Sequence, residues 1–336
     1  MDGIEFERQL MKTNFFQATP LSTCFEADRL CLWDIGARDG FDSFFAPMAW
    51  AVDAIGFEPV SSGFEGLSGS GAWKSERYLP LAIGGRDGEA VLNIPTDPAG
   101  ASFLEHDQAI GRRYHLGDLF DVVQRETVPL RTIGAAIRDF DVRAPTLLKL
   151  DIEGSELAVL EGAGDALSDV LAVKAEAAFL PLRKGQPLAP DILAFMGDAG
   201  FCLMDMIDSH LWRVWPWAAD PFLVCETPSY SRGRLIQTDL LFLKDLANLD
   251  EEKAFSAMLA SAGLGYFDYA IEIVYAFPSI ISERSGLDVS QISEVLADTA
   301  KSYGRARLGM EICQAAKHFA RLLRSKLLGL GVPLQR

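Results

Sequence analysis

The residues best suited to chemistry lie in the stretch LLKLDIEGSELAVLEGA, residues 147–163. The apolar run at its start stops at Asp151, and Glu153 follows two residues later. Carboxylates directly after a buried strand are costly unless something pairs with them. In an open α/β sheet, ligands bind outside the carboxyl ends of the strands. We therefore expect Asp151 and Glu153 to face a pocket, where either could act as the general base that takes a proton from a hydroxyl.

Two other roles for this pair of acids are open on the sequence. Together they could hold an oxygen-ligated, Mg²⁺-like ion, since the four histidines show no recognisable ligand spacing. They could instead only cap the helix that follows, because carboxylates stabilise a helix N-terminus. We favour the catalytic role without a bound metal. Glu156 and Glu161 are expected to be solvated helix acids.

A second candidate site is the stretch DIGARDG, residues 34–40, which also follows an apolar run. Gly36 and Gly40 permit positive φ and let a ligand approach the backbone, and the start of the next helix offers free N–H groups to an anion. Glu58 lies 22 residues after Gly36 at the end of the next expected strand. A carboxylate there can accept hydrogen bonds from two ribose hydroxyls. These features predict a nucleoside-binding half.

The identity of the nucleoside follows from what the turn lacks. A dinucleotide-binding turn needs a third glycine under the pyrophosphate, whereas Phe44 stands where a small residue is expected. Asp34 would crowd a pyrophosphate but suits the sulfonium and ammonium groups of S-adenosylmethionine. We therefore favour S-adenosylmethionine as the cofactor. An NAD-dependent dehydrogenase or epimerase is the alternative enzyme, and a non-catalytic binding protein with a degenerate fold is a third hypothesis.

The elements that must position these residues alternate between strand and helix from Leu30 to about Lys244. This alternation predicts an α/β fold with a mostly parallel sheet. Residues 1–29 are expected to be a helical lead-in, residues 30–247 the α/β domain, and residues 253–336 an all-helical extension. The expected strands are 30–33, 54–57, 78–83, 90–94, 128–133, 147–150, 171–177, 201–206 and 235–244. The expected C-terminal helices are 253–262, 266–284 with a disturbance at Pro278, 289–302 and 305–328. A capping box is expected at Asp288 and Gln291.

Further candidates lie around the expected acceptor side. Glu176 ends the strand 171–177, and Asp239 lies inside an apolar strand, where it should pair with another group. The stretch 210–230 is rich in Trp and Pro and suits a covering loop. Its aromatic and imidazole side chains could form a sugar-stacking wall or simply pack the loop: His210, Trp212, Trp215 and Trp217.

Composition bounds the partners and the compartment. The net charge of −16 disfavours nucleic acid as a partner. Five widely spaced cysteines without a CxxC motif fit a reducing cytosol, so a cytoplasmic location is expected. We expect neither a signal peptide nor a transmembrane segment. Residues 301–336 carry eight basic residues and one acid, so this helix could lie on an anionic membrane, bind a protein or pack on its own domain.

Five segments in order resemble the FkbM-type family of S-adenosylmethionine-dependent methyltransferases: LWDIGARDGFDSFF, IGFEP, LAIGGRDGEAVLN, LKLDIEGSELAVLEGA and GRLIQTDLLFLKD. The resemblance covers about residues 30–245. It implies a Rossmann-like class I methyltransferase sheet of seven strands, the last antiparallel. It also implies O-methylation of a hydroxyl on a small-molecule or glycan acceptor, such as a sugar, a polyketide or a similar secondary metabolite.

The resemblance also implies roles for individual residues. Asp151 and Glu153 match the acidic signature beside the methyl-transfer site. The predicted cofactor contacts are Asp34, Gly36, Ala37, Arg38, Gly40, Glu58, Pro59 and Ile83. Three positions depart from the family pattern. Arg38 stands where asparagine is frequent, and Gly85 where an acid often follows the third strand. Before the central strand, Thr132-Ile133-Gly134 stands where the family commonly has Thr-Leu-Asp.

Overall fold

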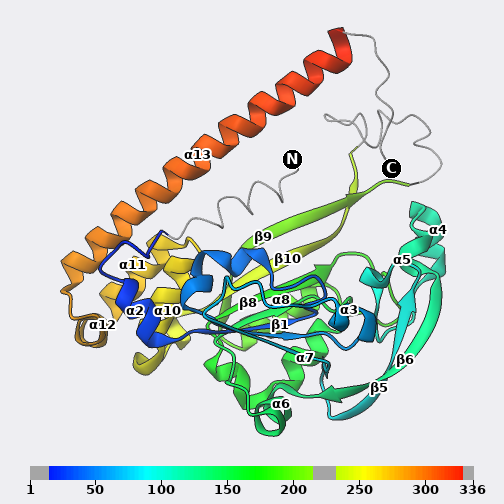
Figure 1. Cartoon of the computed structure of the whole chain (residues 1–336), viewed down its shortest axis with the longest axis horizontal. Helices are drawn as coiled ribbons and strands as arrows, with labels where there is room; N and C mark the ends of the chain where they lie inside the picture. The colour runs from blue at the N-terminus through cyan, green and yellow to red at the C-terminus, as the bar shows by residue number, and fades with distance from the viewer. Residues whose placement is uncertain (1–14, 215–231, 328–336) are drawn as a thin grey trace.

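A seven-stranded sheet forms the centre of the chain in a computed structural model that describes residues 15–214 and 232–327 (Figure 1). The strand order is β3-β2-β1-β7-β8-β10-β9. The strands are β1 (Cys31–Ile35), β2 (Asp53–Phe57), β3 (Ser75–Leu79), β7 (Leu147–Leu150), β8 (Ala172–Ala178), β9 (Phe201–Trp212) and β10 (Arg234–Lys244). The first five strands of this order pair in parallel, and β10 is antiparallel to both of its neighbours. The predicted mostly parallel sheet with an antiparallel last strand is confirmed.

A second, three-stranded sheet has the order β4-β6-β5. Its strands are β4 (Ala82–Ile83), β5 (Gly88–Pro95) and β6 (Val122–Arg131). The single strand expected over 78–83 was wrong, because Pro80 separates β3 of the large sheet from β4 of the small one, and proline lacks the N–H that a sheet interior needs. The region between β5 and β6 contains η2 (Pro98–Gly100), α4 (Gln108–Tyr114) and α5 (Gly117–Phe120).

The two faces of the large sheet carry different cores. One face packs on α6 (Ile133–Phe140), α7 (Glu156–Gly162) and α8 (Ala189–Asp198). The other face, through Leu32 and Leu147, packs on η1 (Ser43–Ala51) and on the C-terminal helices. Alternation of side chains along a strand places Asp34 and Lys149 on this second face, beyond the apolar residues. The same face is therefore apolar near the strand starts and charged near their carboxyl ends.

The helices after β10 form the expected C-terminal extension. They are α10 (Glu251–Gly263), α11 (Phe267–Ala276), α12 (Pro278–Ser285) and α13 (Val289–Leu327), following the short η4 (Leu246–Asn248). The predicted capping box is present, since Asp288 and Gln291 exchange backbone-to-side-chain hydrogen bonds of 2.9 Å. The expected interruption near residue 303 was wrong, because Gly304 costs a helix only about 1 kcal/mol and α13 runs through it.

The N-terminal lead-in shares a core with this extension. Of its described residues only α2 (Ser22–Asp28) is helical, and the part of the prediction before residue 15 lies outside the described residues. Phe16 contacts Phe25 and Phe267, with ring centroids 4.9 and 6.1 Å apart. Across the described ranges, 15–214 and 232–327, no helix has the length and apolarity needed to cross a membrane.

Candidate active site

A cavity of about 660 Å³ opens at the carboxyl ends of the central strands. Six described segments of the large sheet line it: the turn after β1, the residues after β2, the end of β7 with the residues after it, and parts of β8, β9 and β10. The small sheet and the loop that follows β5 close one side through Leu92, Ala101 and Phe103. This location agrees with the expectation for ligands of open α/β sheets.

The turn after β1 is forced into its shape by two glycines. Gly36 has φ +90° and Gly40 has φ +99°. A Cβ on Gly36 would lie 2.0 Å from the carbonyl oxygen of Asp151, so no other residue fits there. The N–H groups of Gly36 and Ala37 donate to the carbonyl oxygen of Phe57 at 3.0 and 3.1 Å. The turn is thus fastened to both β2 and β7, and it brings the two sequence motifs into contact.

The structure divides the predicted cofactor residues into two groups, those that line the cavity and those that are buried outside its lining. Six of them line the cavity: Gly36, Arg38, Gly40, Glu58, Pro59 and Ile83. Asp34 and Ala37 are fully buried and lie outside its lining. The Asp34 carboxylate accepts the Asp42 N–H at 2.7 Å and lies 3.0 Å from Lys149 Nζ. Asp34 therefore holds the turn from behind, and direct cofactor contact by Asp34 and Ala37 stays a prediction.

Glu58 has the surroundings expected of a residue that receives a ligand. Only 4% of it is exposed, and its Oε1 accepts the Val60 N–H at 2.7 Å. Burial raises the pKa of Glu58, and the Val60 N–H and the nearby Arg38 oppose that rise. The Arg38 Nη1 atom is itself buried without a hydrogen-bond partner. A carboxylate and a guanidinium therefore stand together beside the glycine turn, both with hydrogen-bonding capacity for a bound ligand.

Two buried lysines form the floor of the cavity. Their positions are paired across β7 and β8, Lys149 with Lys174. Lys149 Nζ lies 3.0 Å from Asp34 and 3.5 Å from Asp151, and burial alone would lower its pKa but these carboxylates raise it. Lys149 thus stays protonated between the acid of β1 and the acid that follows its own strand.

Lys174 makes the second such bridge. Its Nζ lies 2.6 Å from Asp42, which caps η1, and 2.7 Å from Asp239 of β10. The expectation that Asp239 pairs with another group is confirmed. Burial raises the pKa of Asp239. At Asp42, burial is opposed by Lys174, Lys149 and the Phe44 N–H, which together lower the pKa. The turn and the opposite wall are consequently joined through one cation.

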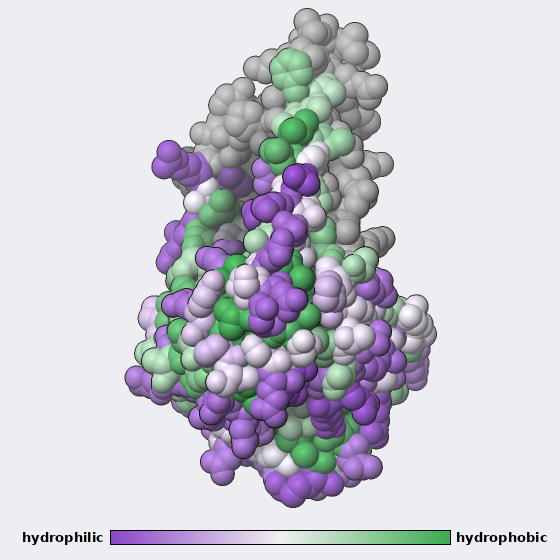
Figure 2. All heavy atoms as spheres, turned by 90° about the vertical axis from the view of Figure 1, so that its left-hand side faces the viewer, coloured by the Kyte–Doolittle hydropathy of each residue, from purple (hydrophilic) through white to green (hydrophobic). Residues whose placement is uncertain are grey.

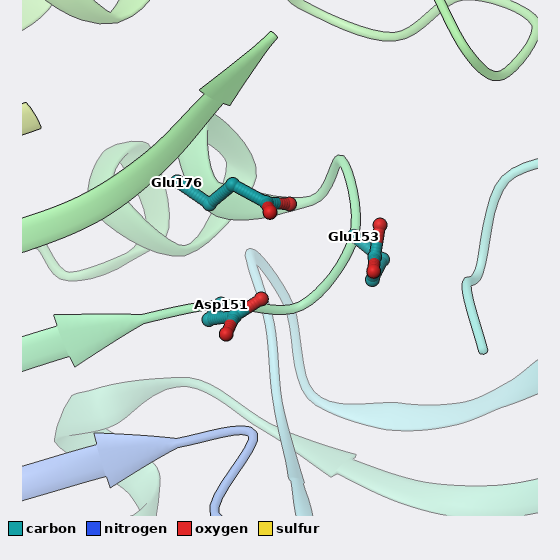
Figure 3. Close-up of side chains that lie close together, drawn as sticks. All are labelled: Asp151, Glu153 and Glu176. Carbon is teal, nitrogen blue, oxygen red and sulfur yellow. The ribbon is translucent and has the colours of Figure 1, made fainter. Parts of the chain in front are cut away.

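Three acids of the cavity converge (Figure 3). One carboxylate oxygen from each of Asp151, Glu153 and Glu176 lies within 4.8 Å of the others. Glu153 Oε2 is 2.6 Å from Arg183, and Glu176 Oε1 accepts the amide N–H of Gln237 at 2.5 Å. Burial raises the pKa of Glu153 against the pull of Arg183, and burial with the neighbouring acids raises the pKa of Glu176 well above its usual value.

The loop that carries these acids is held by its own side chains. Glu153 has φ +59° and Gly154 has φ +108°, so the chain turns sharply there. Glu156 closes the turn by accepting the N–H groups of Ile152 and Gly154 at 3.0 Å. The expectation of a solvated Glu156 was wrong, because this capping position buries the side chain and raises its pKa to about 7. Ser102 adds a hydrogen bond of 2.8 Å to the Glu153 carbonyl.

The covering loop expected over 210–230 begins as a strand instead. β9 continues to Trp212 because it pairs with β10 along its length. His210 lines the cavity, whereas Trp212 packs on Tyr114 with ring centroids 5.5 Å apart. Trp212 therefore belongs to a small apolar cluster, and Trp215 and Trp217 lie outside the described residues.

Sequence reasoning did not identify Lys149, Lys174 or Arg183, the cations that pair with the acids of this site. Lys149 and Lys174 interrupt the apolar runs LLKL and LAVKAEA, and a lysine inside a buried strand was the signal that an acid must face it. Arg183 carried no comparable signal, because it follows the strand in a polar loop. It is only 4% exposed in the fold.

Comparison with known families decides the classification. The family model described as the methyltransferase FkbM domain matches residues 34–203, slightly more than half of the chain. The chain belongs to the FkbM methyltransferase family. Its FkbM domain begins at the buried acid of the first strand and includes the glycine turn, Glu58 and all three converging acids. The mixed α/β fold agrees with a methyltransferase-like architecture. No curated protein matches the chain.

Proposed function

We propose that the chain is an S-adenosylmethionine-dependent O-methyltransferase of the Rossmann-like class I type. The observation that carries the proposal is that one cavity joins the glycine turn and Glu58 to the three acids. A nucleoside half and an acidic half within one cavity are what methyl transfer to a hydroxyl requires. The acceptor class that suits the acids is a polyhydroxylated one, a glycan or a secondary metabolite, because carboxylates accept hydrogen bonds from hydroxyls.

The cofactor half follows from the contacts around the turn. Glu58 would accept hydrogen bonds from the ribose hydroxyls, and Pro59 and Ile83 would cover the apolar part of the nucleoside. The glycines let the chain approach the methionine moiety, whose ammonium suits the acidic surroundings. The bound cofactor supplies a methyl group on a sulfonium, and the protein's task is to hold the acceptor oxygen in line with it.

The acidic half of the cavity would accept the proton that the acceptor hydroxyl loses. The acceptor oxygen forms a bond to the methyl carbon while the carbon–sulfur bond breaks, and the hydroxyl proton passes to a carboxylate. We assign that carboxylate to Asp151, because 46% of its side chain is exposed and its cation, Lys149, is 3.5 Å away. Glu153, fixed by Arg183 at 2.6 Å, would orient the acceptor. Glu176 would remain protonated and donate a hydrogen bond.

A divalent ion could also fit the three acids, since Mg²⁺ takes carboxylate oxygens together with water. It would lower the pKa of the acceptor hydroxyl when bound. However, Arg183 and Lys149 already neutralise two of the three carboxylates. We therefore propose proton transfer without a metal. We also place the enzyme in the cytoplasm, because the cysteines of the described residues, such as Cys24 and Cys31, are free thiols.

The test is calorimetric titration of the purified protein with S-adenosylmethionine, S-adenosylhomocysteine and NAD. We expect the first two to bind and NAD not to bind. Glu58→Gln should weaken both by at least tenfold, since hydrogen bonds to a charged group contribute about 1.5–3 kcal/mol. Asp151→Asn serves as the matched control and should leave cofactor affinity unchanged. Binding of NAD alone would overturn the proposal, and binding of none would favour a non-catalytic protein.

A further inference from the structure

The second half of α13 has no described neighbour to cover it. Its first half packs on the extension, where Ile292 and Leu296 are fully buried, and Tyr303 is its last residue packed on that core. The helix then continues to Leu327. Its far end projects beyond the rest of the molecule (Figure 1). At 1.5 Å per residue this free part is about 36 Å long.

Apolar side chains lie on one face of the free part. Leu308, Ile312 and Phe319 are 57%, 61% and 63% exposed. Their spacings of four and seven residues bring them onto the same side of a helix. Figure 2 shows hydrophobic side chains on the part of the molecule that projects above the body. A contiguous exposed apolar stripe of this kind marks an interaction surface.

The charge of the same segment is opposite to that of the whole chain. Residues 301–327 carry seven basic residues and one acid, Glu311, whereas the whole chain has a net charge of −16. From residue 312 to residue 336 there are five basic residues and no acid. The final nine residues, LGLGVPLQR, add Leu328, Leu330, Val332 and Leu334 to the apolar content. Apolar and basic residues therefore occur together up to the end of the sequence.

We infer that the free part of α13 binds the surface of an anionic membrane. A helix with apolar residues on one face and lysines and arginines elsewhere lies in the interface of a bilayer. Each basic residue near an anionic surface contributes about 1 kcal/mol. The acidic body does not cancel this attraction, because the free part extends about 36 Å and charges are screened within about 8 Å at physiological salt. The surface fits lipid headgroups with negative charge.

A second copy of the chain is the less suitable occupant. Pairing two of these helices would bring two strongly basic segments together, whereas phosphatidylserine headgroups supply the missing negative charge. The inference does not depend on the proposed enzymatic activity, since it rests on residues far from the cavity.

The experiment is co-sedimentation of the full-length protein with vesicles of phosphatidylcholine, alone or mixed with phosphatidylserine. We expect binding only to the mixed vesicles and its loss at high salt. Replacing Arg305 and Arg307 by Gln should weaken binding by about thirtyfold, since two charges contribute about 2 kcal/mol. Replacing Leu308, Ile312 and Phe319 together by Ser should weaken it at least tenfold.

A matched control separates this effect from a general loss of exposed apolar surface. Val123 and Tyr275 are 69% and 64% exposed on other elements, so Val123→Ser with Tyr275→Ser should leave vesicle binding unchanged. Thermal melting of every variant checks that the fold is intact. The inference is overturned by an absence of vesicle binding, by equal binding to neutral vesicles, or by unchanged binding of the apolar triple variant. Self-association without vesicles that the triple variant abolishes would assign the surface to a second copy instead.

Discussion

Replacing Glu156 by glutamine should remove the contribution of this one carboxyl group to the pH dependence of stability. Glu156 is 3% exposed and accepts two backbone N–H groups of the loop that carries Asp151 and Glu153. Burial raises its pKa from 4.5 to about 7. The native state therefore holds a proton between these values that the unfolded chain releases. The resulting stabilisation is fully present below pH 4.5 and is lost as pH rises through about 7.

The size of this effect follows from the two pKa values. Each pH unit between them corresponds to about 1.4 kcal/mol. The free energy of unfolding therefore falls by about 3 kcal/mol as the pH rises from the lower to the higher value. Glutamine keeps an oxygen acceptor for the loop and never ionises. The free energy of unfolding of Glu156→Gln should therefore rise by about 3 kcal/mol relative to that of the unaltered protein across the same pH range. Glu156→Ala, which strands both N–H donors, should lose about 1–3 kcal/mol for each at every pH.

The assay is urea unfolding of the three proteins at several pH values between about 5 and 8. The quantity to compare is the difference in free energy of unfolding between Glu156→Gln and the unaltered protein. Because all other acids are common to both, the difference isolates Glu156. A difference that stays constant over the range would refute the reasoning, since it would show that the carboxylate is ionised in the native state throughout.

Three further predictions concern the turn, the lysine bridge and the acid cluster. Gly36→Ala should abolish stable folding or lower the melting temperature sharply, because its Cβ would meet the Asp151 carbonyl at 2.0 Å; calorimetric melting measures this, and a near-native melting temperature would contradict it. Lys174→Met should destabilise the protein by about 3–5 kcal/mol in denaturant unfolding, because it leaves Asp42 and Asp239 without their cation; an effect below about 1 kcal/mol would show that the bridge is solvent-screened. Excess chelator should leave methyl transfer to the acceptor unchanged in a radiolabel assay, and loss of activity restored by Mg²⁺ would assign the three acids to a metal.

The large sheet was predictable because its strands show the plain signals of buried β structure. Apolar runs that end in an acid or a glycine located β1, β2 and β7, and the resemblance supplied the antiparallel direction of the last strand. The small sheet was less accessible, since β6 is mostly exposed and reads as a polar segment. Pro80 was the one local sign that the strand expected over 78–83 divides between two sheets.

The acids of the candidate site could be predicted from the sequence, whereas Lys149, Lys174 and Arg183 were not. Asp151 and Glu153 were identified because the strand before them is apolar and glycine follows. Arg183 reaches Glu153 from 30 residues away, and such a pairing depends on tertiary packing that no local pattern encodes. Glu156 was misassigned for a related reason, because helical spacing alone does not show that a side chain folds back onto the loop before it.

The antiparallel direction of β10 places the cavity and the start of the C-terminal extension at opposite edges of the sheet. Because this strand runs against its neighbours, its early residues, Gln237 and Asp239, face the cavity. Its last residues instead pair with the beginnings of β8 and β9. Whatever follows β10 therefore leaves from the edge of the sheet opposite the cavity. The extension therefore covers the apolar half of its sheet face without crossing the cavity.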